Sequence, residues 1–196
     1  MSDVPTAPDP SSGADLQGLA HSTADEARGY LDAVTEVASG ANPATALPVL
    51  LLAVSQIGVT GARLGAIADV LPTERFEPDP GPDADVEPLR TGLANLFEGL
   101  DEYIDVVDPL TSGELARGCL SNDLVEIAAA LVHGLRHYEA GRVDEALWWW
   151  QFSYVSSWGE RDASALRVLL SVLGHLRLDA DEETVAGAEF DALHQG

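Results

Sequence analysis

Residues 143–159, with the sequence VDEALWWWQFSYVSSWG, decide how we expect this chain to fold. The segment holds all four tryptophans of the protein. On a helix its apolar side chains cover about 200° of arc, far more than the single stripe of a surface helix. Only a narrow strip through Ser153, Ser156 and Ser157 is polar, and Trp149 falls within it. We therefore predict a central helix, buried through Trp148, Trp150, Phe152, Tyr154 and Trp158.

Helical periodicity extends to both sides of this segment. Apolar residues recur at spacings of three and four, the period of a helix with one buried face. Glycines end several periodic segments, as at Gly40 and Gly141. Because no segment shows sustained alternation of apolar and polar residues, we predict an all-α, single-domain bundle of about six helices. The helices are expected over residues 14–39, 43–70, 88–107, 122–139, 143–159 and 162–177.

The ends and one internal segment differ in composition from the bundle. Residues 1–13 contain three prolines and several small polar residues, which predicts a disordered leader before a helical domain at 14–179. Residues 180–196 are expected to form an acidic, weakly helical tail. Residues 71–88 carry five prolines and six carboxylates, which rules out regular structure there. Ser121 is expected to cap the helix at 122–139.

The strongly acidic charge restricts the partners of this protein. The formal net charge is −23, and the basic residues are ten arginines with no lysine. An acidic surface repels phosphate, so we expect a protein partner with a basic surface and no direct binding of nucleic acid. Without lysine, Schiff-base chemistry and a Walker phosphate lysine are excluded. The loop at 71–88 is either a solvated connector or an acidic surface for a cation or a basic partner, formed by Glu77, Asp79, Asp83 and Asp85.

The sequence favours a cytoplasmic location. Cys119 is the only cysteine, which excludes an internal disulfide and favours a reducing compartment. The N-terminal residues lack the charged and apolar regions of a signal peptide. Residues 44–62 carry no charge, but only 46–54 is densely apolar, which is too short to span a bilayer. We expect no membrane association, keep a membrane helix at 44–62 as an alternative, and leave the oligomeric state open.

Two histidines and a glutamate are the weak candidates for a metal site. His133 and His137 lie four residues apart on one predicted helix face, and Glu126 falls on the same stripe. Gly134 follows His133, however, where the HExxH motif has its glutamate. The stripe also points away from the predicted apolar face. We therefore expect no metal and no cofactor.

Gln151 lies in the middle of the predicted aromatic arc. A buried amide needs partners for its donors and its acceptor. One interpretation is a hydrogen bond to a neighbouring helix or to water. The other is a ligand pocket lined by aromatic residues, where Arg161 could stack or pair with a carboxylate. The binding candidates are Trp149, Gln151, Tyr154, Trp158 and Arg161.

Three segments carry a resemblance to a known family. Residues 138–159 read YEAGRVDEALWWWQFSYVSSWG, residues 75–83 read RFEPDPGPD, and residues 165–170 read ALRVLL. Together they resemble an uncharacterised, all-helical bacterial family of unknown function, over nearly the whole chain after the leader. The resemblance implies a compact cytosolic protein and, through a recombination-repair mediator encoded beside some members, a role linked to DNA repair. It implies no established activity and no catalytic residues.

We therefore expect a noncatalytic helical interaction or accessory protein with an acidic surface. The resemblance adds a link to DNA recombination or repair through a protein partner. The alternative, from another class, is a small-molecule-binding protein or a metal-dependent enzyme or sensor. It would use the aromatic pocket around Gln151, or a metal at His133 and His137.

Overall fold

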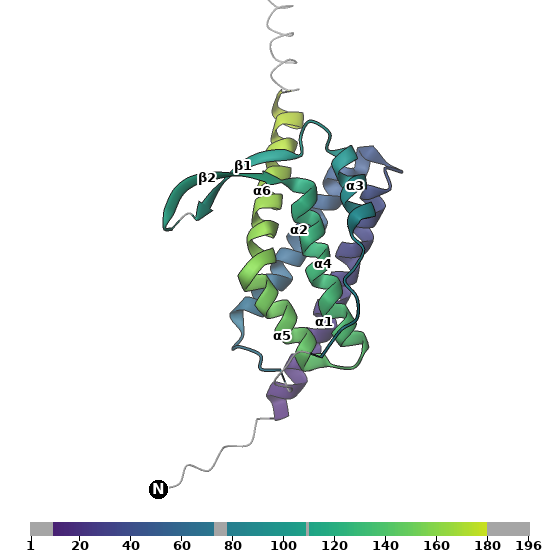
Figure 1. The fold of residues 1–196 in the computed structure, drawn as a ribbon, viewed down its shortest axis with the longest axis vertical. Coiled ribbons are helices and arrows are strands. Elements are labelled where there is room, and N and C mark those ends of the chain that lie inside the picture. The colour runs from purple at the N-terminus through teal and green to yellow at the C-terminus, as the bar shows by residue number, and fades with distance from the viewer. Residues whose placement is uncertain (1–9, 73–77, 109, 180–196) are drawn as a thin grey trace, which may run out of the picture.

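The computed structural model describes residues 10–72, 78–108 and 110–179. In these residues the protein is predominantly helical, with one antiparallel hairpin that projects from the side of the bundle (Figure 1). The helices are α1 (Pro10–Ala38), α2 (Pro43–Ala66), α3 (Glu87–Leu96), α4 (Leu120–Glu139), α5 (Val143–Ser153) and α6 (Gly159–Gly174). Two π-helical segments, η1 (Tyr154–Trp158) and η2 (His175–Asp179), follow α5 and α6. The hairpin consists of β1 (Glu102–Asp108) and β2 (Ser112–Cys119).

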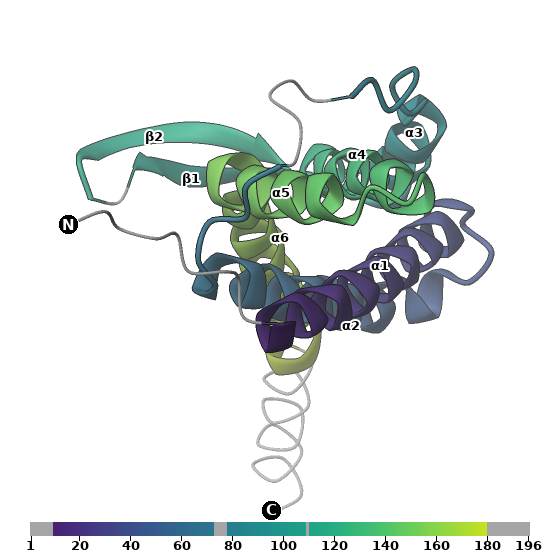
Figure 2. The ribbon, with the colours of Figure 1, turned by 90° about the horizontal axis from the view of Figure 1, so that it is seen from below.

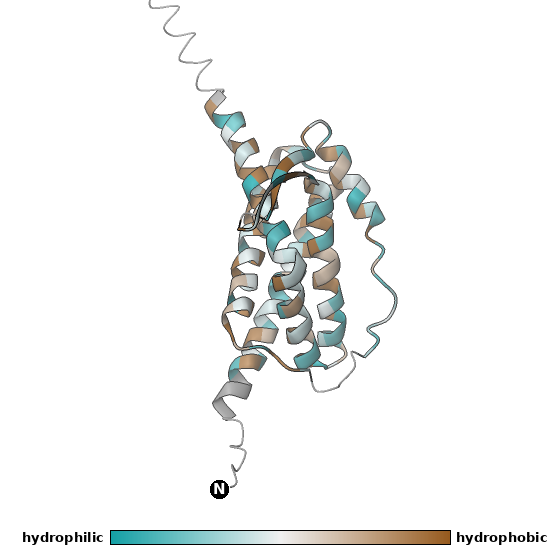
Figure 3. Ribbon diagram, turned by 60° about the vertical axis from the view of Figure 1, so that its left-hand side comes forward, coloured by the Kyte–Doolittle hydropathy of each residue, from teal (hydrophilic) through white to brown (hydrophobic). Residues whose placement is uncertain are grey.

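The helices form two layers that α6 joins. Helices α1 and α2 lie in one layer, and α3, α4 and α5 lie in the other (Figure 2). Helix α6 contacts both α2 and α4. Hydrophilic and hydrophobic residues alternate along the helices (Figure 3), as expected where each helix buries one face. The helical fold class predicted from the sequence is confirmed.

The last helix is continuous, so the described residues contain five unbroken helices rather than the predicted six. Segments α5, η1, α6 and η2 follow one another without a gap from Val143 to Asp179. The sequence predicted a break near Gly159, but this glycine has helical torsion angles. A Cβ atom at Gly159 would lie 2.7 Å from the Tyr154 carbonyl oxygen. The glycine therefore permits the close approach of the π turn instead of ending the helix.

The buried face of the Trp-rich helix matches the predicted one only in part. Trp150 and Trp158 are fully buried, as predicted. Phe152, predicted to be in the core, is 52% exposed, and Trp148 is half-buried. Ser153, on the predicted polar strip, is buried because its hydroxyl donates to the Trp149 carbonyl at 2.6 Å and accepts from the Trp158 indole at 3.1 Å. When a helix is apolar nearly all round, its sequence does not specify which face is buried. The two hydrogen bonds of Ser153 allow this serine to lie on the buried face.

The predicted helix at 88–107 is wrong after Leu96. Helix α3 ends there, and β2 lies entirely in the segment between the helices predicted at 88–107 and 122–139. The positive φ of Gly99, 82°, breaks the helical path. Ile104, Val106 and Val107 then favour extended backbone because their side chains are branched at Cβ. At the turn, the Asp108 carboxylate accepts a hydrogen bond from the Leu110 backbone amide at 2.8 Å.

Several element ends also differ from the predicted ones. Helix α1 begins at Pro10, inside the predicted leader. The remainder of that leader, residues 1–9, and the predicted tail at 180–196 lie outside the described residues. Ser121 does not cap α4, because the helix already begins at Leu120. Asp101 accepts instead from the Ser121 backbone amide at 2.7 Å and from the Ser121 hydroxyl at 2.8 Å.

Helix α2 is long and apolar enough, among the described residues, to cross a membrane by length and composition. In the bundle it packs against α1 and α6. Leu50, Val54 and Leu64 on its inner face are fully buried, whereas Leu52 and Val59 are exposed. Helix α2 is thus a core helix of this bundle.

Candidate functional site: the hairpin arm and its groove

The hairpin β1–β2, here called the arm, is fastened to the bundle through one buried carboxylate. Asp123 of α4 is only 4% exposed. Its Oδ2 accepts a hydrogen bond from the Tyr103 hydroxyl of β1, and its Oδ1 accepts from the Arg161 guanidinium at 2.8 Å. Asp123 therefore joins β1, α4 and α6 at one point. A carboxylate shared by two donors, one of them charged, is a strong and directional contact.

A second set of contacts holds β1 against α6. The Asp105 carboxylate forms an ion pair with Arg167 at 2.6 Å and accepts from the Ser164 hydroxyl at 2.7 Å. The Arg167 guanidinium also lies 5.7 Å from the centre of the Tyr103 ring. Ser164 and Arg167 are three residues apart and thus share one face of α6. The arm therefore extends from the bundle in a defined orientation.

The titration of these groups reflects their surroundings. Burial raises the pKa of Tyr103, and the hydrogen bond to Asp123 raises it further. Burial also raises the pKa of Asp123, although the Tyr103 and Arg161 hydrogen bonds oppose the shift. The Ser164 hydrogen bond is the largest cause of the lowered pKa of Asp105, with Arg167 contributing. Such perturbed groups gather at functional sites as well as in structural ion-pair networks.

Asp162, the residue after Arg161 in α6, is a buried carboxyl group. It is 6% exposed, and its Oδ1 has no hydrogen-bond partner among the described residues. Burial raises the pKa of Asp162 to about 7. Its other oxygen faces Gly58 of α2, where any side chain would collide with it. Burial, followed by the charges of Asp162 and Asp123, raises the pKa of Tyr30.

A groove of about 360 Å³ separates the arm from the start of α6. The arm contributes Val107 and Ala116 to it, together with the charged side chains Asp105 and Arg117. The π segment and α6 contribute polar groups, including Ser157, Glu160 and Arg161. Polar and charged side chains therefore line both walls of the groove, and the apolar groups come from the arm. This volume falls at the lower end of the range of small-molecule sites.

The outer face of the arm exposes several apolar side chains to solvent. Val106 and Leu115 are paired across the strands and are 36% and 64% exposed. Ile104, paired with Arg117, is 53% exposed, and Leu110 near the tip is 93% exposed. Exposed apolar side chains that cluster in this way mark interaction surfaces more often than scattered ones do.

The structure gives Gln151 a structural role. Its side-chain nitrogen donates to the Leu64 carbonyl at 2.9 Å, and its oxygen accepts from the Val70 backbone amide at 2.8 Å. The amide therefore satisfies backbone groups at the C-terminal end of α2, which agrees with the first of the two interpretations. A cavity of about 330 Å³ lies beside it, lined by Asp69, Val70, Leu71, Trp148, Gln151, Phe152, Val155 and Ser156.

Three of the other predicted binding residues also serve packing. The Trp149 indole donates to the Ala130 carbonyl at 3.0 Å. Tyr154 contacts Trp158, with ring centres 4.7 Å apart, and covers Gly61 of α2. Arg161 alone among the predicted binding residues lines the groove beneath the arm. Sequence reasoning missed the arm residues, although the branched side chains at 104–107 carried the signal for a strand.

The structure keeps the two histidine candidates together and places Glu126 in a different contact. The rings of His133 and His137 meet edge to face, with ring centres 5.3 Å apart. His133 stacks on Trp149, with ring centres 3.8 Å apart. His137 is fully buried, so the predicted outward-facing stripe is wrong: α5 covers this face of α4. Glu126 forms an ion pair with Arg90 at 3.2 Å. No group of three or more potential metal ligands occurs within the described residues.

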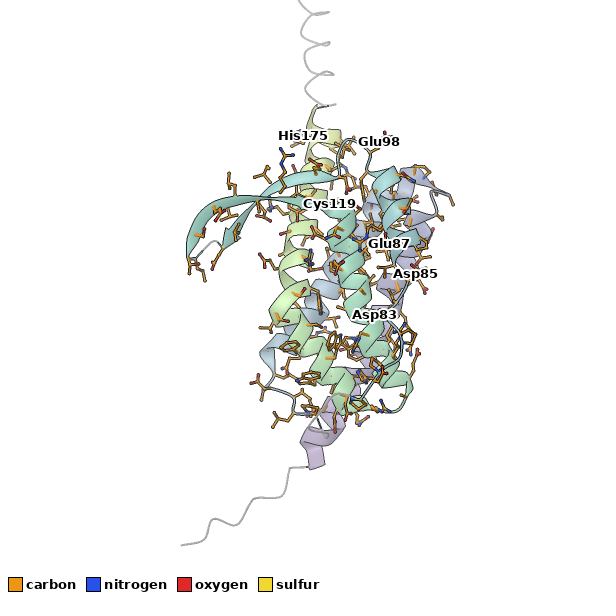
Figure 4. All side chains as sticks on the ribbon, in the orientation of Figure 1. Asp83, Asp85, Glu87, Glu98, Cys119 and His175 are labelled. Atoms are coloured by element: carbon orange, nitrogen blue, oxygen red, sulfur yellow. The ribbon has the colours of Figure 1, made fainter. Side chains whose placement is uncertain are left out.

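The acidic loop lies beside α4 (Figure 4). Asp79, Asp83 and Asp85 are exposed, and Glu77 lies outside the described residues. Asp85 accepts from the Glu87 backbone amide at 3.3 Å, and the Arg136 guanidinium of α4 donates to the Pro82 carbonyl. A role in partner binding for this loop stays a prediction.

The fold and the arm define a helical-bundle protein with a projecting hairpin. Residues 14–175 match the model of a domain of unknown function, DUF5063, so the chain belongs to that family. A crystal structure of protein BF1032 from Bacteroides fragilis, Northeast Structural Genomics Consortium target BfR309, has a similar fold. The TM-score is 0.62 and the identity 16%, over 76% of this chain and 89% of that chain. A comparison with curated proteins gave no match. The resemblance to an uncharacterised helical family is confirmed.

Proposed function

We propose that this protein is a noncatalytic interaction or accessory protein that binds a protein partner through its arm. The observation that carries the proposal is the contrast between the two faces of the arm. Ion pairs hold the inner face on α6, whereas Ile104, Val106 and Leu115 on the outer face are exposed to solvent. A recognition element that is already ordered loses little conformational entropy on binding.

Charge favours a partner with a basic binding segment. The whole chain carries a formal charge of −23, and residues 101–119 contain five carboxylates and one arginine. Such a field accelerates encounter with basic surfaces and repels nucleic acid. The link to DNA recombination or repair suggested by the family resemblance would then run through a protein partner.

Site-specific photo-crosslinking in cells of the source organism tests this function. A photoreactive amino acid at Leu115 should give a covalent adduct of defined mass with one protein. The same amino acid at Leu52 provides the control, because the two leucines are 64% and 65% exposed but lie on different elements. Equal adducts from both positions, or none from Leu115, would contradict a role for the arm.

A further inference from the structure

We infer that the free edge of β2 accepts an extended, basic segment of the partner as a third strand. This inference rests on the proposed function and specifies how the arm binds. Strand β2 pairs with β1 along one edge, and its other edge has no strand partner within the described ranges. Five consecutive residues, 113–117, are exposed. An uncovered strand edge presents unpaired backbone donors and acceptors to an incoming chain.

The edge of β2 lacks the features that usually prevent strand addition. Proteins protect such edges with proline, lysine, bulges or covering segments. Strand β2 contains neither proline nor lysine. Its one arginine, Arg117, forms a cross-strand ion pair with Glu102 at 3.0 Å. The one irregularity in register lies between Val106 and Asp108, near the tip, so the rest of the ladder remains regular.

The two faces of the arm specify alternating side chains in the partner. Side chains of a strand point to opposite faces in turn. On the outer face they would lie beside Leu115, which favours apolar residues. On the inner face they would enter the groove, where Glu160 is an exposed carboxylate. The two arginines that line the same groove are already paired, Arg161 with Asp123 and Arg117 with Glu102. A segment that alternates apolar and basic residues therefore fits both faces. A second copy of this chain fits less well, because each copy carries a formal charge of −23.

The direct probe is a capped, fluorescent peptide of alternating arginine and valine, as long as β2, added to the full chain. We expect saturable binding by anisotropy that weakens with added salt, and slowed hydrogen exchange at alternate β2 amides. The matched control peptide has the same sequence, with alternate backbone nitrogens methylated to remove the donors. It should bind at least roughly tenfold more weakly, since each lost hydrogen bond contributes about 1 kcal/mol. Equal binding of both peptides would overturn strand addition.

Two pairs of variants locate the binding on the arm. Leu115→Thr should weaken the peptide several-fold, whereas Leu52→Thr should not. Glu160→Gln should reduce the salt dependence, whereas Glu98→Gln, an exposed glutamate outside the groove, should leave it unchanged. Equal effects within either pair would overturn the inference.

The two proposals can fail separately. If the peptide does not bind but Leu115 still crosslinks one protein, strand addition is wrong and the proposed function stands. If sedimentation shows a dimer that Leu115→Thr abolishes, the occupant of the edge is a second copy and the inference is wrong. If neither peptide binding nor crosslinking occurs, both proposals fall.

Discussion

At the scale of single residues, Trp150 and Phe152 show why the Trp-rich segment stabilises the fold unevenly. Trp150 is fully buried, and its indole donates to the Leu131 carbonyl at 3.2 Å. Phe152 is 52% exposed and stacks on Trp148, with ring centres 5.5 Å apart. The same type of side chain therefore contributes differently at the two positions.

We expect Trp150→Ala to lower the free energy of unfolding by about 3–5 kcal/mol, because it leaves a large cavity. Phe152→Ala should cost about 1 kcal/mol, since half of its surface already meets water. Urea unfolding followed by circular dichroism measures both. A larger loss for Phe152→Ala would contradict the observed orientation of α5.

The buried carboxyl group of Asp162 should make the free energy of unfolding decrease as the pH rises. Its pKa is about 7 in the folded protein, against 3.8 for an ordinary aspartate. Between these values the folded chain holds a proton that the unfolded chain has released, so stability falls as pH rises from about 4 to 7. Asp162→Asn should remove this slope and stabilise the protein at pH 8 by about 1–3 kcal/mol. Unfolding at pH 5 and pH 8 measures the difference. A variant with an unchanged slope would show that other groups cause it.

At the scale of elements, the arm depends on ion pairs that acid should break. The pKa of Asp105 is lowered in the folded protein, so its contribution is present above about pH 4 and is lost as the pH falls below the ordinary aspartate value. We expect Asp105→Asn at neutral pH to speed hydrogen exchange in residues 102–119 and leave the melting temperature of the bundle nearly unchanged. Acidification of the wild type should do the same to the arm. Asp108→Asn, at the turn, is the matched control and should not release β1 from α6. If residues 102–119 of the Asp105→Asn variant stay as protected from hydrogen exchange as in the wild type, apolar contacts alone are enough to hold the arm on the bundle.

The elements also show how far sequence reasoning reaches. The buried Trp150 and the glycines that end α1 and α4 follow from spacing alone, because helix periodicity and positive φ have local causes. The arm could not be predicted from spacing. Its first strand was mistaken for helix because four apolar residues fall at helical spacing by coincidence: Leu96, Leu100, Tyr103 and Val107. The site at Asp123 requires contacts between residues 20 and 38 positions apart, which no local pattern reveals. Arg161 is a binding candidate by sequence and lines the groove in the structure, but only the structure identifies Asp123 as its carboxylate partner.

At the scale of the whole molecule, charge should govern encounter more than stability. We expect the combined neutralisation of Glu77, Asp79, Asp83 and Asp85 to leave the melting temperature nearly unchanged, because the described members are exposed. Association with the native partner should slow, most strongly at low salt, where screening is weakest. Stopped-flow fluorescence measures the rate. An unchanged rate at low salt would show that the acidic loop is only a connector.

The π turn at η1 sets the rotation of α6 about its own axis. An α-helix advances about 100° per residue, since it has 3.6 residues per turn. Deleting one residue within 154–158 would turn α6 by about this angle relative to α5. Ser164 and Arg167 would then leave the inner face of β1, while α5 kept its place against α4. The attachment of the arm thus depends on the number of residues in this one turn as well as on their identity.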